Sequence, residues 1–147
     1  MAYLSALGLD IGRKRIGVAG CDGTGLIATG LTTVERHQFD QVVADLGQIV
    51  QERRVQVLVV GLPLTMAGAE SFQARQVKKV AERLAAVLQL PLVYVDERLT
   101  SVEAEQMIQA EGRLPRHHRA LIDRKAAAII LQRWLDERRR KPQDGIF

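Results

Sequence analysis

The sequence has almost no cysteine and no long apolar run. Its single cysteine among 147 residues, Cys21, cannot form a disulfide within the chain, which favours a reducing compartment such as the cytoplasm. Cys21 follows an apolar segment, so we expect it to be buried at the end of a strand. No apolar stretch approaches the roughly 20 residues that cross a bilayer. Residues 1–4 also lack the basic segment and cleavage site of a signal peptide. We therefore expect a cytoplasmic protein that binds no membrane.

Aromatic residues are also scarce, with one Trp, two Tyr and three Phe. They are too few to form a stacking platform for unpaired bases, so binding of nucleic acid would depend on charge. Charge is present and unevenly distributed: residues 113–147 contain ten Lys or Arg and four Asp or Glu, whereas residues 1–112 carry a small net negative charge. A basic carboxyl-terminal quarter favours a polyanionic partner, bound with weak base specificity and strong salt dependence.

The periodicity of apolar residues predicts an α/β fold. Three apolar segments separated by glycine-containing turns begin the chain, and they indicate an antiparallel meander. Segments of helical period then alternate with short apolar segments, which are typical of parallel strands covered on both faces. The pattern predicts one domain over residues 1–140, a five-stranded mixed sheet flanked by helices, and a frayed tail at 141–147. The expected strands are Leu4–Asp10, Arg15–Cys21, Leu26–Val34, Val57–Val60 and Leu92–Val95, and the expected helices are Phe39–Arg54, Ser71–Leu88, Val102–Ala110 and Ala120–Arg139.

Three carboxylates stand in apolar surroundings. Asp10 ends the first strand, within LGLDIGRKRIGVAG at residues 7–20, and Glu97 follows the fifth strand. Asp123 lies on the apolar stripe of the last helix, where alanines at 126–128 would let the helix approach the sheet closely. If that helix packs on the first and fifth strands, the carboxylates converge, and they stay ionised together only with cations between them. Mg²⁺ prefers oxygen ligands, and two such ions about 3.5–4 Å apart could hold the attacking and leaving oxygens of a phosphodiester displacement.

Each carboxylate also has a structural interpretation. Asp10 could cap the turn that follows it through backbone amides, and Glu97 could pair with Arg98 or Arg124. Asp123 could be stabilised by the helix dipole in the first turn of the last helix. Each interpretation is reasonable alone, but a coincidence of all three is not expected.

Four segments together resemble the YqgF/RuvX family, and they cover nearly the whole chain: LGLDIGRKRIGVA, VVGLPLTMAG, VYVDERLTSVEA and IDRKAAAIILQRWL. The resemblance implies a ribonuclease H-like fold and a metal-dependent nuclease, a hydrolase acting on ester bonds. It implies that Asp10, Glu97 and Asp123 are the catalytic residues and the ligands of Mg²⁺ or Mn²⁺. The family is known as the pre-16S rRNA nuclease and, in older usage, as a Holliday junction resolvase. The implied role is processing the 5′ end of pre-16S rRNA during ribosome maturation, with branched DNA as the alternative substrate.

Basic residues near these carboxylates are candidates for binding nucleic acid, although each could instead be solvated. Some lie in the turn after Asp10, one follows Glu97, and the others lie in the loop before the last helix. Where the family usually has small residues after the last aspartate, this chain has Arg124 and Lys125, which could reach phosphate. His117 and His118 are not expected to bind metal, because Mg²⁺ prefers oxygen. The nucleic-acid-binding candidates are Arg13, Lys14, Arg15, Arg98, Arg113, Arg116 and Arg119.

Two other functions stay open at this stage. The first segment is also similar to the first phosphate loop of the actin, sugar kinase and Hsp70 ATPases. Those proteins need a second such loop in a second lobe, and the sequence shows none. The other alternative is a non-catalytic module on the same fold that binds nucleic acid or protein.

Overall fold

Five strands and three helices form the part of the chain that the structure describes. The structure is a computed structural model, and it describes residues 3–65, 67–97 and 118–140. The expected helix at 102–110 and the expected frayed tail lie outside these residues. The strands are β1 (Ala6–Ile11), β2 (Arg15–Cys21), β3 (Ala28–Glu35), β4 (Val57–Leu62) and β5 (Leu92–Asp96), and the helices are α1 (Phe39–Arg53), α2 (Phe72–Leu88) and α4 (His118–Arg140).

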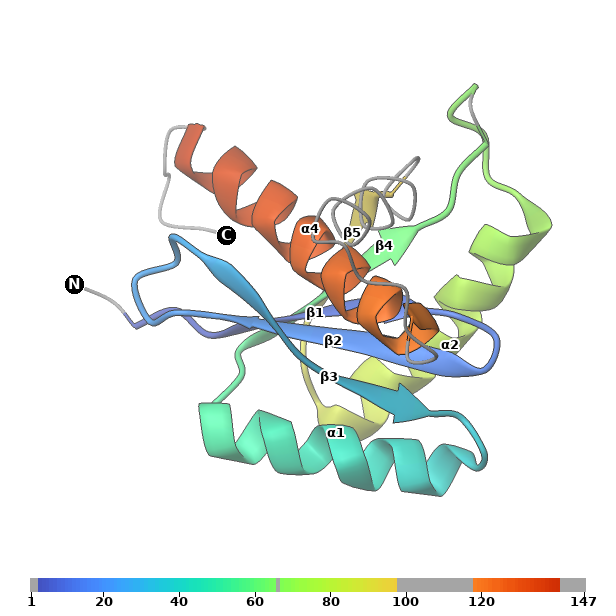
Figure 1. Cartoon of the computed structure of the whole chain (residues 1–147), viewed down its shortest axis with the longest axis horizontal. Coiled ribbons are helices and arrows are strands. Elements are labelled where there is room, and N and C mark those ends of the chain that lie inside the picture. The colour runs from blue at the N-terminus through green and yellow to red at the C-terminus, as the bar shows by residue number, and fades with distance from the viewer. Residues whose placement is uncertain (1–2, 66, 98–117, 141–147) are drawn as a thin grey trace.

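The strands make one mixed sheet in the order β3-β2-β1-β4-β5 (Figure 1). Strand β2 pairs antiparallel with both β1 and β3, whereas β4 pairs parallel with both β1 and β5. The predicted meander followed by parallel strands is therefore confirmed. Because β1, β4 and β5 run in the same direction, their carboxyl ends meet at one edge of the sheet.

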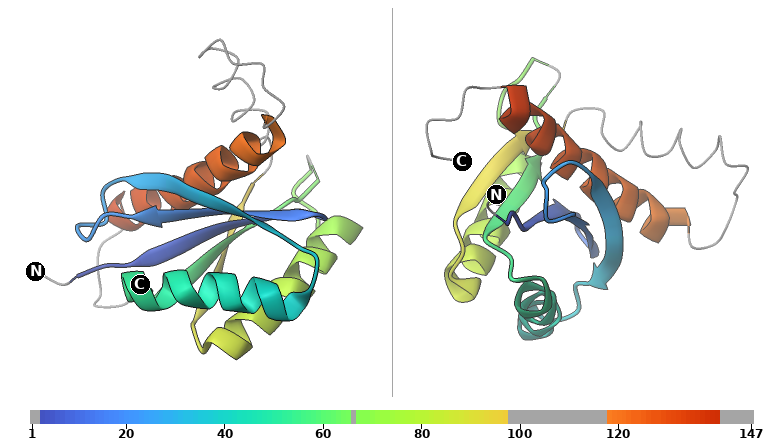
Figure 2. Two further views of the ribbon diagram at one scale, coloured as in Figure 1. Left: turned by 60° about the horizontal axis from the view of Figure 1, so that its bottom comes forward. Right: turned by 90° about the vertical axis from the view of Figure 1, so that its left-hand side faces the viewer.

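Helices cover both faces of the sheet, with α4 on one face and α1 and α2 on the other (Figure 2). Alternation along β1 shows how the sequence builds both layers. Leu7, Leu9 and Ile11 belong to the core under α1 and α2, whereas Ala6 belongs to the core under α4. Asp10 has the same parity as Ala6, so its side chain lies on the α4 face.

Small residues let α4 lie close to the sheet, as the sequence predicts. Ala126 and Ala127 are fully buried in the interface. On the sheet side, a Cβ at Gly8 would lie 2.7 Å from Leu131 Cβ, and a Cβ at Gly17 would lie 1.9 Å from the carbonyl oxygen of Asp123. Side chains at these glycines would push the helix away.

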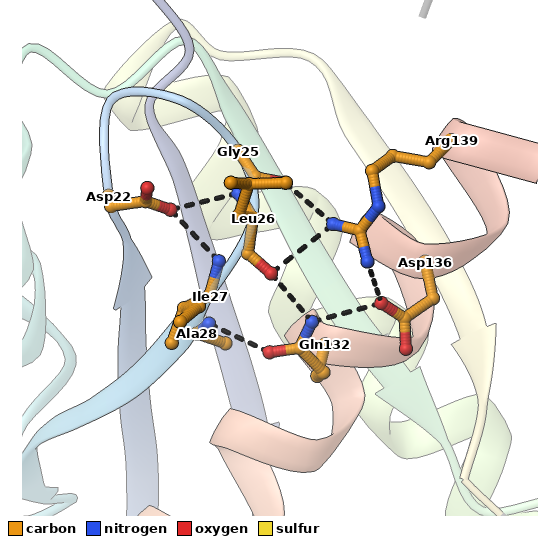
Figure 3. Close-up of polar contacts among 8 residues, drawn as sticks. All are labelled: Asp22, Gly25, Leu26, Ile27, Ala28, Gln132, Asp136 and Arg139. Carbon is orange, nitrogen blue, oxygen red and sulfur yellow. Dashed lines mark hydrogen bonds and ion pairs between the residues drawn. The ribbon is translucent and has the colours of Figure 1, made fainter.

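The carboxyl-terminal half of α4 is fastened to the turn between β2 and β3 (Figure 3). The side-chain amide of Gln132 accepts from the Ala28 N–H and donates to the Leu26 carbonyl, each over 2.9 Å. Arg139 donates to the same Leu26 carbonyl over 3.2 Å, and Asp136 accepts from Gln132 and from Arg139. These contacts fix the rotation of α4 and therefore the direction in which Asp123 points.

Two boundaries differ from the expectation in ways that affect the site. Gly61 and Leu62 were expected in a loop but belong to β4, because Leu62 pairs with Asp96 at the end of β5. Helix α4 begins at His118, two residues before the expected start. Cys21 is buried as expected, and its sulfur accepts from the Ala6 N–H over 3.4 Å.

Candidate active site

Asp10 lies near the carboxyl end of β1, opposite Gly17 of β2. Its side chain is half-buried on the α4 face of the sheet, opposite the core that contains Leu9 and Ile11. The turn after Asp10 is closed by the Gly12 N–H, which donates to the Arg15 carbonyl over 2.8 Å. A hydrogen bond between backbone groups thus closes this turn. The structural interpretation of Asp10, in which its side chain caps the turn, is not needed to explain it.

Glu97 follows β5 directly, and its N–H donates to the Leu62 carbonyl over 3.1 Å, which extends the pairing of β4 with β5 by one residue. Its side chain crosses Gly61: a Cβ there would lie 2.9 Å from Glu97 Oε2. The missing side chain at Gly61 therefore leaves room for Glu97 to reach Asp10, and the two carboxyl groups share a hydrogen bond.

Asp123 is placed beside this pair by the close approach of α4 to Gly17. It lies in the second turn of a helix whose first turn contains no acidic residue, so the helix dipole does not explain it. Its Oδ2 accepts from Arg15 Nε over 2.8 Å, and both side chains are about one-fifth exposed. Asp123 is near enough to Asp10 to raise the pKa of that carboxyl by charge repulsion.

The three carboxyl groups hold protons more tightly than isolated ones. Burial, with repulsion from Asp123, raises the pKa of Asp10 to about 6 despite its hydrogen bond with Glu97. Burial and then repulsion from Asp10 raise the pKa of Glu97 to about 9, against an opposing effect of Arg133. Burial also raises the pKa of Asp123, although Arg15 opposes it. Without a cation, the site therefore favours protonated carboxyl groups over its full negative charge.

This donor set suits a divalent cation. Carboxylate oxygens are the ligands that Mg²⁺ and Mn²⁺ take, and crowded carboxyls with raised pKa values are ready to exchange protons for a cation. Among the residues that the structure describes, no three carboxylate, histidine or cysteine side chains are grouped closely enough to complete a metal site. Asp10 and Glu97 interact with each other, whereas Asp123 pairs with Arg15 beside them.

The basic candidates fall into three groups. Arg13 and Lys14 are exposed in the turn after β1, and Arg119 is exposed in the first turn of α4. Arg15 instead pairs with Asp123. The candidates Arg98, Arg113 and Arg116, together with His117, lie outside the described residues.

Sequence reasoning missed two arginines that support the site. Arg36 donates from Nη1 to the Gly12 carbonyl over 2.5 Å, and its N–H donates to the Lys14 carbonyl over 2.8 Å, so it braces the turn after Asp10. Arg133 donates from Nη1 to the Asp96 carbonyl over 3.0 Å and lowers the pKa of Glu97. Neither is adjacent in sequence to a carboxylate of the site, so only the antiparallel pairing and the docking of α4 could have revealed them.

A family model described as RuvX, Holliday junction resolvase, matches residues 4–137. The chain belongs to the RuvX family. Its match over nearly the whole chain favours this interpretation over a phosphate loop of the ATPase type.

Two relatives agree with membership of the RuvX family, and two solved structures share the fold of this chain. A Trichormus variabilis protein named pre-16S rRNA nuclease is 65% identical over 98% of this chain and 95% of its own length. A Synechocystis protein of the same name is 60% identical over 97% of this chain and 93% of its own. Thermus thermophilus RuvC in complex with a Holliday junction superposes with a TM-score of 0.58 at 16% identity, covering 93% of this chain and 96% of RuvC. A yeast mitochondrial Holliday junction resolvase superposes with a TM-score of 0.54 at 11% identity, covering 91% of this chain and 78% of the resolvase. These structures confirm the expected ribonuclease H-like fold.

The raised pKa values predict that the stability of this RuvX protein without metal depends on pH. In the unfolded chain the carboxyls of Asp10 and Glu97 ionise near their ordinary values of 3.8 and 4.5. The folded state therefore keeps protons that the unfolded state releases, and these groups lower the free energy of unfolding as pH rises from about 4 to about 9. Replacing Glu97 with glutamine removes most of this loss. The stability gained by Glu97→Gln over wild type should grow from near zero at pH 4 to a few kcal/mol, on the order of 2–4, at pH 9. Urea unfolding of both proteins in chelator measures this difference in the free energy of unfolding. A difference that does not change with pH would contradict the prediction.

Proposed function

We propose that the chain is a metal-dependent nuclease that hydrolyses phosphodiester bonds, with Mg²⁺ or Mn²⁺ held by Asp10, Glu97 and Asp123. A divalent ion bound there polarises the scissile phosphate and lowers the pKa of an attacking water. The protein supplies rigid placement: β1 holds Asp10, the extended pairing of β4 with β5 holds Glu97, and α4 carries Asp123. One observation carries the proposal: Glu97, after β5, extends across Gly61 of β4, so that its carboxyl group interacts with that of Asp10 where β1 and β5 end.

The basic residues are proposed to hold the phosphate backbone. Arg13, Lys14 and Arg119 lie on segments next to the carboxylates and are exposed. Arg98, Arg113 and Arg116 are proposed for the same role, on the sequence alone. Arg15 pairs with Asp123 through Nε, and its other guanidinium N–H groups are proposed to contact phosphate while that ion pair stays closed.

The substrate that we propose is the 5′ end of pre-16S rRNA, in the cytoplasm, where ribosomes mature. The names of the relatives from Trichormus and Synechocystis support it. A second candidate is a Holliday junction, because the family description and the fold neighbour from Thermus thermophilus name that substrate. No helix in the described part of the chain is long and apolar enough to cross a membrane.

A panel of labelled substrates tests these proposals. We expect single-stranded RNA that spans the 5′ processing site of pre-16S rRNA to be cut in Mg²⁺ and in Mn²⁺, and to stay intact in chelator. Matched duplex RNA and a four-way DNA junction are the comparison substrates. Faster cleavage of the junction would select the second candidate, whereas cleavage that persists in chelator would contradict metal dependence. Salt-dependent binding of every substrate with cleavage of none would indicate a non-catalytic module.

A further inference from the structure

A cleft separates α4 from the outer edge of the sheet. Strand β3 is one of the two edge strands, since it pairs with β2 alone in the five-stranded sheet. The cleft has a volume of about 470 Å³, within the range of small-molecule sites. Its α4 residues recur at helical spacing on one helix face, and two of them follow Asp123 directly. The residues that matter here are Leu121, Arg124, Lys125, Ala128 and Ile129 of α4, and Gly30 of β3.

The cleft combines aliphatic walls with two cationic side chains. Leu121, Ala128 and Ile129 supply apolar surface, and Arg124 and Lys125 supply positive charge. None of the described residues that line this cleft is acidic. The occupant that this chemistry fits has a flat, weakly polar part and an anionic part.

Arg124 has an unused hydrogen-bond donor at this cleft. Its Nε is buried, and within the described residues it has no hydrogen-bond partner. Gly30 makes the placement possible, because a Cβ there would lie 2.7 Å from Arg124 Cγ. A buried N–H without an acceptor is unfavourable, so a ligand that supplies an acceptor to this N–H gains affinity.

The opposite side of the same edge strand has the opposite charge. A groove between β3 and α1 is lined by Glu35, Asp45 and Glu52 as well as by uncharged residues. A polyanion that approaches the β3 edge is repelled on the α1 side and attracted on the α4 side. The charge pattern thus directs a nucleic-acid strand along α4, toward Asp123.

We propose that the cleft between α4 and β3 binds one unpaired nucleotide of the RNA substrate, next to the phosphate that is cut. The base lies against Leu121, Ala128 and Ile129, where the Arg124 guanidinium can also stack on it, and its phosphate is held by Arg124 and Lys125. This inference rests on the proposed nuclease function and adds a subsite to it. Aliphatic walls bind any base, so the subsite selects unpaired strands rather than a sequence.

Fluorescence anisotropy with a labelled single-stranded RNA, in chelator so that nothing is cut, tests the subsite. Arg124→Ala should weaken binding by about five- to ten-fold, because a charge-assisted contact is lost. The slope of log affinity against log salt should fall by about 0.7 for each phosphate contact removed. Ala128→Leu, which fills the cleft without changing charge, should weaken binding and leave the slope unchanged. Lys79 is an exposed lysine of α2, and Lys79→Ala is the matched control, which should change neither the affinity nor the salt slope.

Three results would overturn the inference while leaving the nuclease proposal standing. The first is wild-type affinity in both folded cleft variants, with folding checked by circular dichroism. The second is a loss of affinity for duplex RNA in the cleft variants that is as large as their loss of affinity for single-stranded RNA. The third is a wild-type dimer in sedimentation that the cleft variants convert to monomer with no change in RNA affinity, which would make the cleft a protein interface. A wild-type protein that binds no RNA at all would instead contradict the proposed function itself.

Discussion

Asp10→Asn should lower the rate of phosphodiester cleavage by about a thousand-fold and, in the absence of divalent metal, raise stability. Asparagine has the shape of aspartate but lacks the charge that a divalent ion needs, and losing one such electrostatic contact to a transition state costs about 10²–10³ in rate. The same change removes a buried negative charge beside Glu97 and Asp123. Because a neutral amide can donate to Glu97, we expect the free energy of unfolding at pH 8 to rise by on the order of 1–2 kcal/mol. Single-turnover cleavage and urea unfolding in chelator measure the two effects.

Asp22→Asn is the matched control for that change. Asp22 lies in the turn between β2 and β3, where the N–H groups of Ile27 and Leu26 donate to its Oδ1 over 2.9 Å (Figure 3). Those backbone bonds, with one from Thr24, hold the pKa of Asp22 down to about 2. We therefore expect Asp22→Asn to leave cleavage unchanged and to lower stability slightly at neutral pH, the opposite sign to Asp10→Asn. Full activity in Asp10→Asn would remove the central role of that carboxylate.

The strand and helix pattern of this chain could be predicted because burial imposes simple periods. Strand β2 has the expected bounds, Arg15–Cys21, since glycine-containing turns flank it on both sides. The predicted end of β4 was wrong, because Gly61 and Pro63 are residues typical of a loop. The continuation through Gly61 depends on pairing with β5, which no local pattern contains.

The carboxylates could be predicted for a related reason: a charge in an apolar run is visible in the sequence. Their partners were not visible. Arg15 was expected to contact phosphate, yet it pairs with Asp123, which is 108 residues away in the chain. Arg133 reaches the carbonyl of Asp96, next to Glu97, from α4. The docking of α4 depends on glycines in four different strands. Long-range pairs of this kind follow from packing distances between elements, and residue type does not encode those distances.

Because of these packing distances, we expect Gly17→Ala to disrupt the docking of α4 more than any other Gly→Ala substitution at a described glycine. A Cβ at Gly17 would lie 1.9 Å from the carbonyl oxygen and 2.3 Å from the carbonyl carbon of Asp123, and backbone atoms cannot move aside as a side chain can. Helix α4 would have to shift by about 1 Å, a displacement that can cost about 100-fold in rate when it misplaces a catalytic group. Overpacking of this kind should also lower the free energy of unfolding by about 1–3 kcal/mol. Cleavage at saturating metal and urea unfolding are the measurements.

Two other Gly→Ala changes separate instability from displacement of Asp123. Gly8→Ala meets Leu131 Cβ at 2.7 Å, two turns further along α4, so it should cost stability and retain far more activity than Gly17→Ala. Gly47→Ala lies inside α1 with its nearest neighbour, Leu88 Cδ2, at 3.8 Å, and it should raise stability by about 0.5–1 kcal/mol without affecting cleavage. If Gly8→Ala and Gly17→Ala lost activity in proportion to their lost stability, the position of α4 over Gly17 would have no special role. If Gly17→Ala alone lost activity, the close contact at that glycine would be what carries Asp123 to the other two carboxylates.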